Sequence, residues 1–201
     1  MHITVLTGAS RGLGLAMAQQ LLAPDRLLLC LSRSTHPELQ AQADALGAPL
    51  LQWSADLVDG EAVAARLAQW LGEQNQVEVG SATLINNAGV NLFQPIEESS
   101  YDDWDWVLGV NLGGVINGVM TFVPRMIAAG NGGYIVNTAS MAGWLAAPLM
   151  GVYNVSKHAV VSLTETLYHD LKLVDAPIGT SVLCPYFIPT AIAQSHRHRP
   201  D

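Results

Sequence analysis

Positive charge is scarce in this chain, which carries 9 Lys and Arg against 17 Asp and Glu in 201 residues. The formal net charge is −8 at pH 7. A surface that acidic is a poor match for nucleic acid or for an anionic membrane, so we expect neither as a partner. A small anionic ligand held in a local site is compatible with this charge.

Cysteine is scarce as well, since only Cys30 and Cys184 occur. Each lies in an apolar run, and neither has the neighbour spacing of a metal site. We interpret them as buried, reduced thiols, expect no bound metal, and expect a cytoplasmic protein. Met1 leads directly into an apolar run, so we also expect no secretory leader.

The longest uncharged run extends from Trp106 to Pro124 and approaches the length of a membrane span. It contains Asn111, Asn117 and four glycines, a combination that a lipid-facing helix seldom carries. We therefore predict a helix that is buried on most sides, partly against another subunit.

Strand-like and helix-like runs alternate along the chain. Strands are expected at residues 3–7, 26–32, 50–54, 82–86, 133–138 and 180–184, and helices at 12–22, 38–46, 60–71, 101–128 and 152–173. The strand runs are continuously apolar, which indicates a parallel sheet buried on both faces. With about 150 residues per domain as the norm, we predict one α/β domain over residues 1–201, doubly wound and Rossmann-like. The polar residues 196–200 are expected to fray.

A glycine-rich turn follows the first expected strand and reads Thr7-Gly8-Ala9-Ser10-Arg11-Gly12-Leu13-Gly14. Glycines let the backbone approach a pyrophosphate, and the N–H groups at the start of the next helix point at it. The spacing differs from the commonest dinucleotide fingerprint, and a simple tight turn is the alternative. Its place directly after the first strand favours a dinucleotide site.

The end of the second strand tests this interpretation, because the residue that contacts the ribose lies there in dinucleotide folds. Ser32 occupies that place, 18 residues after Gly14, and Arg33 follows it. A carboxylate would bind the free 2′-hydroxyl of NAD and repel a 2′-phosphate, whereas Arg33 and Arg11 could pair with the phosphate. This favours NADP over NAD; two solvated surface arginines are the alternative.

Tyr153 and Lys157 lie four residues apart at the start of an expected helix, so their side chains project about one turn apart. A phenol has an ordinary pKa near 10, and an ammonium held beside it favours the phenolate. Such pairs also occur by chance on surfaces. Ser140, just past the fifth strand, faces the cleft of a parallel sheet and could hold a substrate carbonyl, although a turn residue is the simpler interpretation of a lone serine.

The order of these motifs is specific. Thr7-Gly8-x-x-x-Gly12-x-Gly14 comes first, followed by Asn86-Asn87-Ala88-Gly89, Asn111, Ser140 and Tyr153-x-x-x-Lys157. In this order the sequence resembles the short-chain dehydrogenases/reductases of the compact, non-extended branch. The resemblance implies an oxidoreductase that uses a nicotinamide dinucleotide and assembles as a homodimer or homotetramer.

The resemblance also implies a role for each matching residue. Tyr153 would exchange a proton with the substrate oxygen, Lys157 would lower the pKa of Tyr153 and bind the nicotinamide ribose, and Ser140 would hold the substrate oxygen. Asn111 would interrupt its helix and hold a proton-relay water. The implied cofactor contacts, besides Tyr153 and Lys157, are Gly8, Ser10, Arg11, Gly12, Leu13, Gly14, Ser32, Arg33, Asp56, Leu57, Asn87, Ala88, Gly89, Pro185, Ile188 and Thr190.

Two features depart from the family pattern. Tyr186 stands where the family usually has glycine, and the sequence given stops soon after Thr190, where a lid, a further helix and a last strand normally follow. An apolar segment, residues 141–150, is expected along the substrate cavity and contains no Lys or Arg to bind a carboxylate.

Two functions are compatible with these residues. The first is an NADP-dependent oxidoreductase acting on a carbonyl or secondary alcohol of a largely apolar small molecule. The alternative is a non-catalytic, NADP-binding regulatory protein on the same fold, which the short end and Tyr186 make plausible. Intact Tyr153 and Lys157 favour the enzyme.

Overall fold

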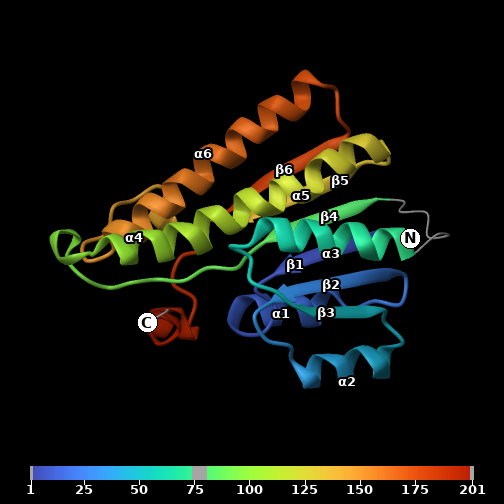
Figure 1. The fold of residues 1–201 in the computed structure, drawn as a ribbon, viewed down its shortest axis with the longest axis horizontal. Coiled ribbons are helices and arrows are strands. Elements are labelled where there is room, and N and C mark those ends of the chain that lie inside the picture. The colour runs from blue at the N-terminus through green and yellow to red at the C-terminus, as the bar shows by residue number, and fades with distance from the viewer. Residues whose placement is uncertain (1, 74–80, 200–201) are drawn as a thin grey trace.

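The computed structural model describes residues 2–73 and 81–199, and its centre is a six-stranded parallel sheet (Figure 1). The strands are β1 His2–Thr7, β2 Arg26–Ser32, β3 Leu50–Ser54, β4 Ala82–Asn86, β5 Gly133–Thr138 and β6 Ile178–Leu183. Their order is β3-β2-β1-β4-β5-β6, the order of a doubly wound dinucleotide-binding sheet. The predicted fold class is confirmed, with β6 beginning two residues before its predicted start.

Helices cover both faces of this sheet. They are α1 Gly12–Leu21, α2 Pro37–Leu46, α3 Gly60–Glu73, α4 Tyr101–Leu108, α5 Gly114–Ala129 and α6 Gly151–Leu173. Successive residues of β2 point to opposite faces. Leu29 joins a cluster with Val63 of α3 and Phe122 of α5, whereas Cys30 joins a cluster with Ala18 of α1. This double burial explains the continuously apolar strand runs.

The helix predicted over residues 101–128 is divided into two. A π-helical turn, Gly109–Gly113, separates α4 from α5 and holds the fully buried Asn111. Length and composition alone would let Tyr101–Ala129 cross a membrane, but 44% of its most apolar window is buried and α5 packs on α3 and β4. The core helix of a soluble protein passes the same test, so the run is weak evidence for a membrane span.

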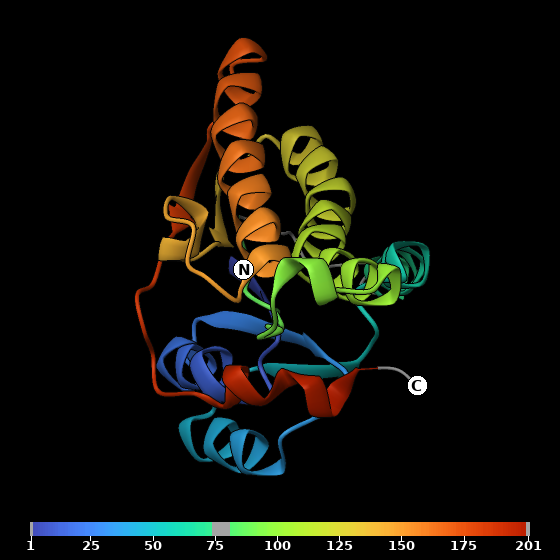
Figure 2. The ribbon, with the colours of Figure 1, turned by 90° about the vertical axis from the view of Figure 1, so that its left-hand side faces the viewer.

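The C-terminal segment, a 3-10 helical stretch at Ala191–His198, crosses the edge of the sheet where the strands end (Figures 1 and 2). The prediction that the end of the chain frays is wrong for Arg199, whose Nη1 lies 2.7 Å from Oδ1 of Asp103 on α4. Pro200 lies outside the described residues. The segment, the switch in strand order between β1 and β4, and the start of α6 meet at one edge of the sheet, where ligands bind in such folds.

Candidate active site

The turn after β1 is shaped by its glycines. Gly8 and Gly12 have φ of +72° and +55°, a left-handed conformation that side chains rarely adopt. A Cβ on Gly14 would lie 2.1 Å from the carbonyl oxygen of Gly8, so that position has no room for a side chain. Arg11, the residue before α1, makes no side-chain cap, which leaves the first N–H groups of α1 directed at the cavity described below.

Thr7 ties this turn to the loop after β4. Its Oγ1 accepts hydrogen bonds from the backbone N–H groups of Asn87, at 2.9 Å, and Ala88, at 3.1 Å. Asn87 Nδ2 in turn donates to the carbonyl oxygen of Thr7 at 3.2 Å. The two neighbouring strands β1 and β4 therefore present their loops as one rigid floor.

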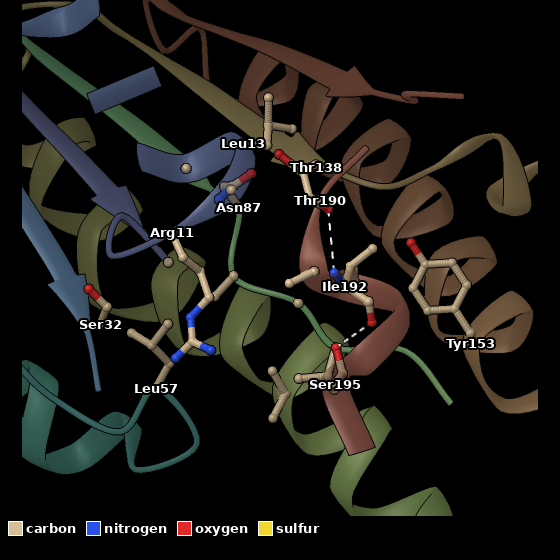
Figure 3. Close-up of a pocket in the computed structure, with 18 of the residues that line it drawn as sticks. Arg11, Leu13, Ser32, Leu57, Asn87, Thr138, Tyr153, Thr190, Ile192 and Ser195 are labelled. Carbon is tan, nitrogen blue, oxygen red and sulfur yellow. Dashed lines mark hydrogen bonds between the residues drawn. The ribbon is translucent and has the colours of Figure 1, made fainter. Parts of the chain in front are cut away.

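The end of β2 forms a second wall. Ser32 is 9% exposed, and its Oγ donates to the carbonyl oxygen of Ser34 at 3.2 Å. Figure 3 shows Arg11 reaching toward the side of the cavity where Ser32 and Leu57 lie. The Asp56 carboxylate accepts from Val58 N at 3.1 Å, so it also shapes the turn before α3.

The first two turns of α6 bring Tyr153 and Lys157 to the opposite end of the cavity. Both are buried, with 7% and 3% of their surface exposed. Lys157 Nζ donates to the carbonyl oxygen of Thr138 at 2.9 Å and lies 5.7 Å from the ring centroid of Tyr153. Ser140 begins a 3-10 turn, accepts from Ala142 N at 3.1 Å, and is hydrogen-bonded to Tyr153.

Burial dominates the protonation of these side chains. It raises the pKa of Tyr153, and the hydrogen bond with Ser140 offsets only part of that increase. Burial also lowers the pKa of Lys157 to about 8, with Cys184 opposing the shift. Desolvation therefore sets the direction of the Tyr153 pKa in the protein alone, and the lowering by Lys157 that the family resemblance implies stays a prediction. The phenol is protonated at neutral pH.

These walls surround an open cavity of about 630 Å³, within the usual range of ligand pockets, about 300–1,000 Å³. All the predicted cofactor contacts line it, from Gly8 to Thr190, as do Ser140, Tyr153 and Lys157. Figure 3 places Ser32 and Tyr153 at its two ends. The cavity thus brings together residues that are far apart in the sequence.

A nicotinamide dinucleotide fits the groups that line this cavity. The Thr138 hydroxyl there is buried without a hydrogen-bond partner among the described residues, so a bound group could satisfy it. The glycine turn offers the close backbone approach and uncapped helix start that a pyrophosphate needs.

A sequence profile of short chain dehydrogenases matches residues 2–201. The chain belongs to this family. This short-chain dehydrogenase is 39% identical to "C alpha-dehydrogenase" of Sphingobium sp. (strain NBRC 103272 / SYK-6), over 99% of this chain and 64% of that protein. It is 31% identical to "CLA biosynthesis dehydrogenase/reductase" of Lactiplantibacillus plantarum, over 98% of this chain and 68% of that protein.

Among solved structures, the short-chain dehydrogenase resembles a short chain dehydrogenase/reductase from Burkholderia phymatum in complex with NAD. The TM-score is 0.86 and the identity 42%, over 100% of this chain and 70% of that chain. The sequence given thus spans about two thirds of the length of such relatives.

Asn111 is the one predicted catalytic residue of this short-chain dehydrogenase that does not line the cavity. It interrupts its helix as predicted, but its side-chain amide bonds to Val90 and Ser156 behind the cavity wall. No signal in the sequence pointed to Ser156.

Other residues of the cavity wall were missed by the sequence reasoning. They come from α4, the π turn and the C-terminal segment, and include Asp102, Asp105, Trp106, Val110, Ile192, Ser195 and Arg199. None belongs to a local motif; their position depends on how α4 and the C-terminal segment pack in this short-chain dehydrogenase.

The segment predicted along the substrate cavity, residues 141–150, does not line the cavity, although several of its apolar side chains are exposed. Trp144 and Leu145 follow Ser140 and are 54% and 58% exposed, and Leu149 is 56% exposed with a φ of +61°. Tyr186, which replaces the usual glycine, lines the cavity and is 84% exposed. The Trp144 indole is held by a hydrogen bond from its Nε1 to Cys184 Sγ at 3.2 Å.

Proposed function

We propose that the protein is an NADP-preferring oxidoreductase that acts on a carbonyl or secondary alcohol of a largely apolar small molecule. The observation that carries the proposal is the meeting of Ser140, Tyr153 and Lys157 at one end of a cavity whose other end has the glycine turn and Arg33. A non-catalytic binding protein would have no need of a buried lysine beside a buried tyrosine, since burying an ammonium costs free energy.

The proposed chemistry follows from the protonation of these side chains. Burial keeps Tyr153 a neutral acid at pH 7, so its hydroxyl can give a proton to the oxygen of a carbonyl substrate. Ser140 donates a second hydrogen bond to that oxygen and stabilises the charge that develops there. Lys157 stands behind Tyr153 and supports the phenolate left after proton transfer. A bound nicotinamide dinucleotide supplies or takes up the hydride.

The proposed preference for NADP rests on the end of β2. Ser32 places no carboxylate there to repel a 2′-phosphate. Arg33, the next residue, lines the cavity, and Arg11 reaches toward the Ser32 side of it (Figure 3). A charge-assisted contact to the phosphate contributes about 1.5–3 kcal/mol, which is a preference of about 10- to 150-fold. The Burkholderia phymatum neighbour is in complex with NAD, so NAD is the alternative to exclude.

Fluorescence titration of NADPH and NADH tests this preference in the parent and in single variants. We expect Arg33→Ala to reduce the preference without abolishing it, because Arg11 remains. Ser32→Asp is expected to go further and improve relative NADH binding, since its carboxylate repels the phosphate. Arg125→Ala, an exposed arginine on α5, is the control and is expected to change neither affinity. Equal affinities in the parent, or tighter NADH binding, would contradict the proposal.

A largely apolar substrate is supported by the surroundings of Tyr153. Tyr186 lines the cavity, and Trp144 and Leu149, which lie between Ser140 and Tyr153 in the sequence, have exposed apolar side chains. Between Ser140 and Tyr153 the chain has no lysine or arginine to bind a substrate carboxylate. These features favour an uncharged ketone, aldehyde or secondary alcohol as the substrate. Separately, the two cysteines, which form no disulfide, favour a cytoplasmic enzyme.

A further inference from the structure

A chain of buried hydrogen bonds lies directly behind the proposed catalytic residues. Ser156, fully buried on α6, donates from its Oγ to the backbone carbonyl of Tyr153 at 2.7 Å. The same oxygen accepts from Asn111 Nδ2 at 3.0 Å. Asn111 is also fully buried, and its side chain meets the backbone of Val90 twice, through Oδ1 from Val90 N at 2.8 Å and Nδ2 to Val90 O at 2.9 Å.

The hydrogen-bond donors and acceptors of these buried groups allow one arrangement of the bonds. Val90 N can only donate, so the atom that faces it is the Asn111 carbonyl oxygen, and the amide nitrogen then faces Val90 O and Ser156. Both amide hydrogens of Asn111 are used in this way. Ser156 has one hydroxyl hydrogen, and it goes to the Tyr153 carbonyl. Every group is satisfied, and removing one leaves a buried partner without its bond.

This chain joins three walls of the cavity. Val90 lies in the loop after β4, Asn111 lies in the π turn between α4 and α5, and Ser156 belongs to the second turn of α6. A Cβ on Gly89 would lie 3.3 Å from Asn111 Oδ1 and 3.5 Å from Lys157 Nζ, so the amide and the ammonium flank the same point. The position of Tyr153 relative to the cavity floor is therefore fixed through Ser156.

We propose that Ser156 is a positioning residue, which holds the first two turns of α6 so that the Tyr153 hydroxyl stays aligned with Ser140 and Lys157. This inference rests on the proposed function for its kinetic consequence. Without the Ser156 hydroxyl, Tyr153 loses its link to Asn111 and the turn can shift. A displacement of about 1 Å can lower the rate about 100-fold, and we expect a smaller displacement to lower it about 10-fold.

Helix α6 itself contains a matched control residue, Thr164, two turns beyond Ser156. Thr164 is also buried, its Oγ1 donates back to the Val160 carbonyl at 2.7 Å, and it accepts from Asn137 Nδ2 at 3.0 Å. Like Ser156, it donates to a helix carbonyl and accepts from a buried asparagine, but it lies away from Tyr153, and its carbonyl partner is four residues back instead of three. Thr164→Val removes the hydroxyl and keeps the volume, so it reports the structural cost of such a bond.

The experiment measures alcohol oxidation in the parent, Ser156→Ala, Ser156→Cys and Thr164→Val. For Ser156→Ala we expect kcat to fall about 10-fold with cofactor KM within about twofold. The apparent pKa of the catalytic base in the pH profile of kcat should rise by about half a unit, because the phenolate loses alignment with Lys157. Ser156→Cys keeps a weaker hydrogen-bond donor, so its kcat is expected to lie between those of the parent and Ser156→Ala. Thr164→Val should keep both kcat and the pH profile.

Parent-like kcat and pH profile in Ser156→Ala would overturn the inference, as would equal kinetic losses in Thr164→Val. A parent without turnover would contradict the proposed function instead. Hydrogen–deuterium exchange then decides the inference alone: faster exchange over residues 151–157 in Ser156→Ala, and not in Thr164→Val, supports it. Unchanged exchange there overturns it.

Discussion

At the scale of single residues, Lys157 carries the largest electrostatic cost in the site. It is one of two lysines in the sequence, and it is buried whereas Lys172, near the end of the same helix, is exposed. Burial lowers the pKa of Lys157 to about 8. Below pH 8 Lys157 is charged in both the folded and the unfolded state, so the folded state is destabilised by the full desolvation free energy of the ammonium. Between pH 8 and about 10.5 the folded lysine loses its proton first, and this destabilisation decreases.

Lys157→Met should therefore change how stability depends on pH. We expect the free energy of unfolding of the variant to exceed that of the parent by most at pH 7–8. This difference in free energy should narrow by up to about 3 kcal/mol as the pH approaches 10.5. Urea unfolding at a series of pH values measures it, with Lys172→Met as the control that keeps the parent's pH dependence. A difference that stays constant or widens with pH would show that Lys157 is not desolvated.

At the scale of elements, the start of α4 depends on Asp103. Its carboxylate accepts from the Ser100 backbone and side chain, at 2.9 and 2.8 Å, and from Gln94, and it pairs with Arg199. Burial alone would raise the pKa of Asp103, but these hydrogen bonds and the guanidinium together hold it below its ordinary value. One carboxylate thus caps α4 and anchors the C-terminal segment over the cavity.

Asp103→Ala is expected to destabilise the protein by about 1–3 kcal/mol, because it removes a helix cap, three hydrogen bonds to a buried carboxylate and an ion pair with the partly exposed Arg199. The lowered pKa means that this contribution is present above the ordinary carboxyl pKa and is lost as the pH falls through the folded-state pKa. The difference in free energy of unfolding between parent and variant should therefore be constant from pH 5 to 8 and decrease below about pH 4. Thermal unfolding measures it, and Asp102→Ala, an exposed neighbour, should cost less than about 0.5 kcal/mol.

The same scale shows what local sequence patterns can predict. The strands and most helices follow from apolar runs and glycine positions, which are local properties. The π turn at Gly109–Gly113 does not, because its Asn111 bonds to Val90, 21 residues away. The anchoring of Arg199 by Asp103 is likewise a contact between distant segments, which no periodicity reveals.

At the scale of the whole molecule, the site could be predicted because a parallel sheet brings the carboxyl ends of its strands to one edge. The turn after β1, Ser32, Asn87, Ser140 and Pro185 all follow strand ends or lie at them, so the topology alone gathers them. The pKa of Tyr153 could not be predicted, because it depends on how deeply the folded chain buries the ring.

Assembly is also a property of the whole molecule, and we predict a homodimer or homotetramer with α5 and α6 in the interface. Met120 and Ile116 on α5 are 68% and 40% exposed, and Val155 on α6 is 46% exposed. Met120→Glu places a charge on this surface and should shift the protein to monomers, whereas Gln42→Glu, exposed on α2, should not. Sedimentation velocity at micromolar concentration checks this, and a parent that is only monomeric refutes it.

The central claim is that Tyr153 transfers the proton in a nicotinamide-dependent reaction, and one measurement tests it most directly. NADPH consumption is followed at neutral pH with a panel of apolar ketones and aldehydes, for the parent and for Tyr153→Phe. Turnover by the parent should fall by at least about 100-fold in the variant, because the ring remains but its ionisable hydroxyl is gone, while NADPH affinity changes little. Near-parent turnover in Tyr153→Phe would contradict the account.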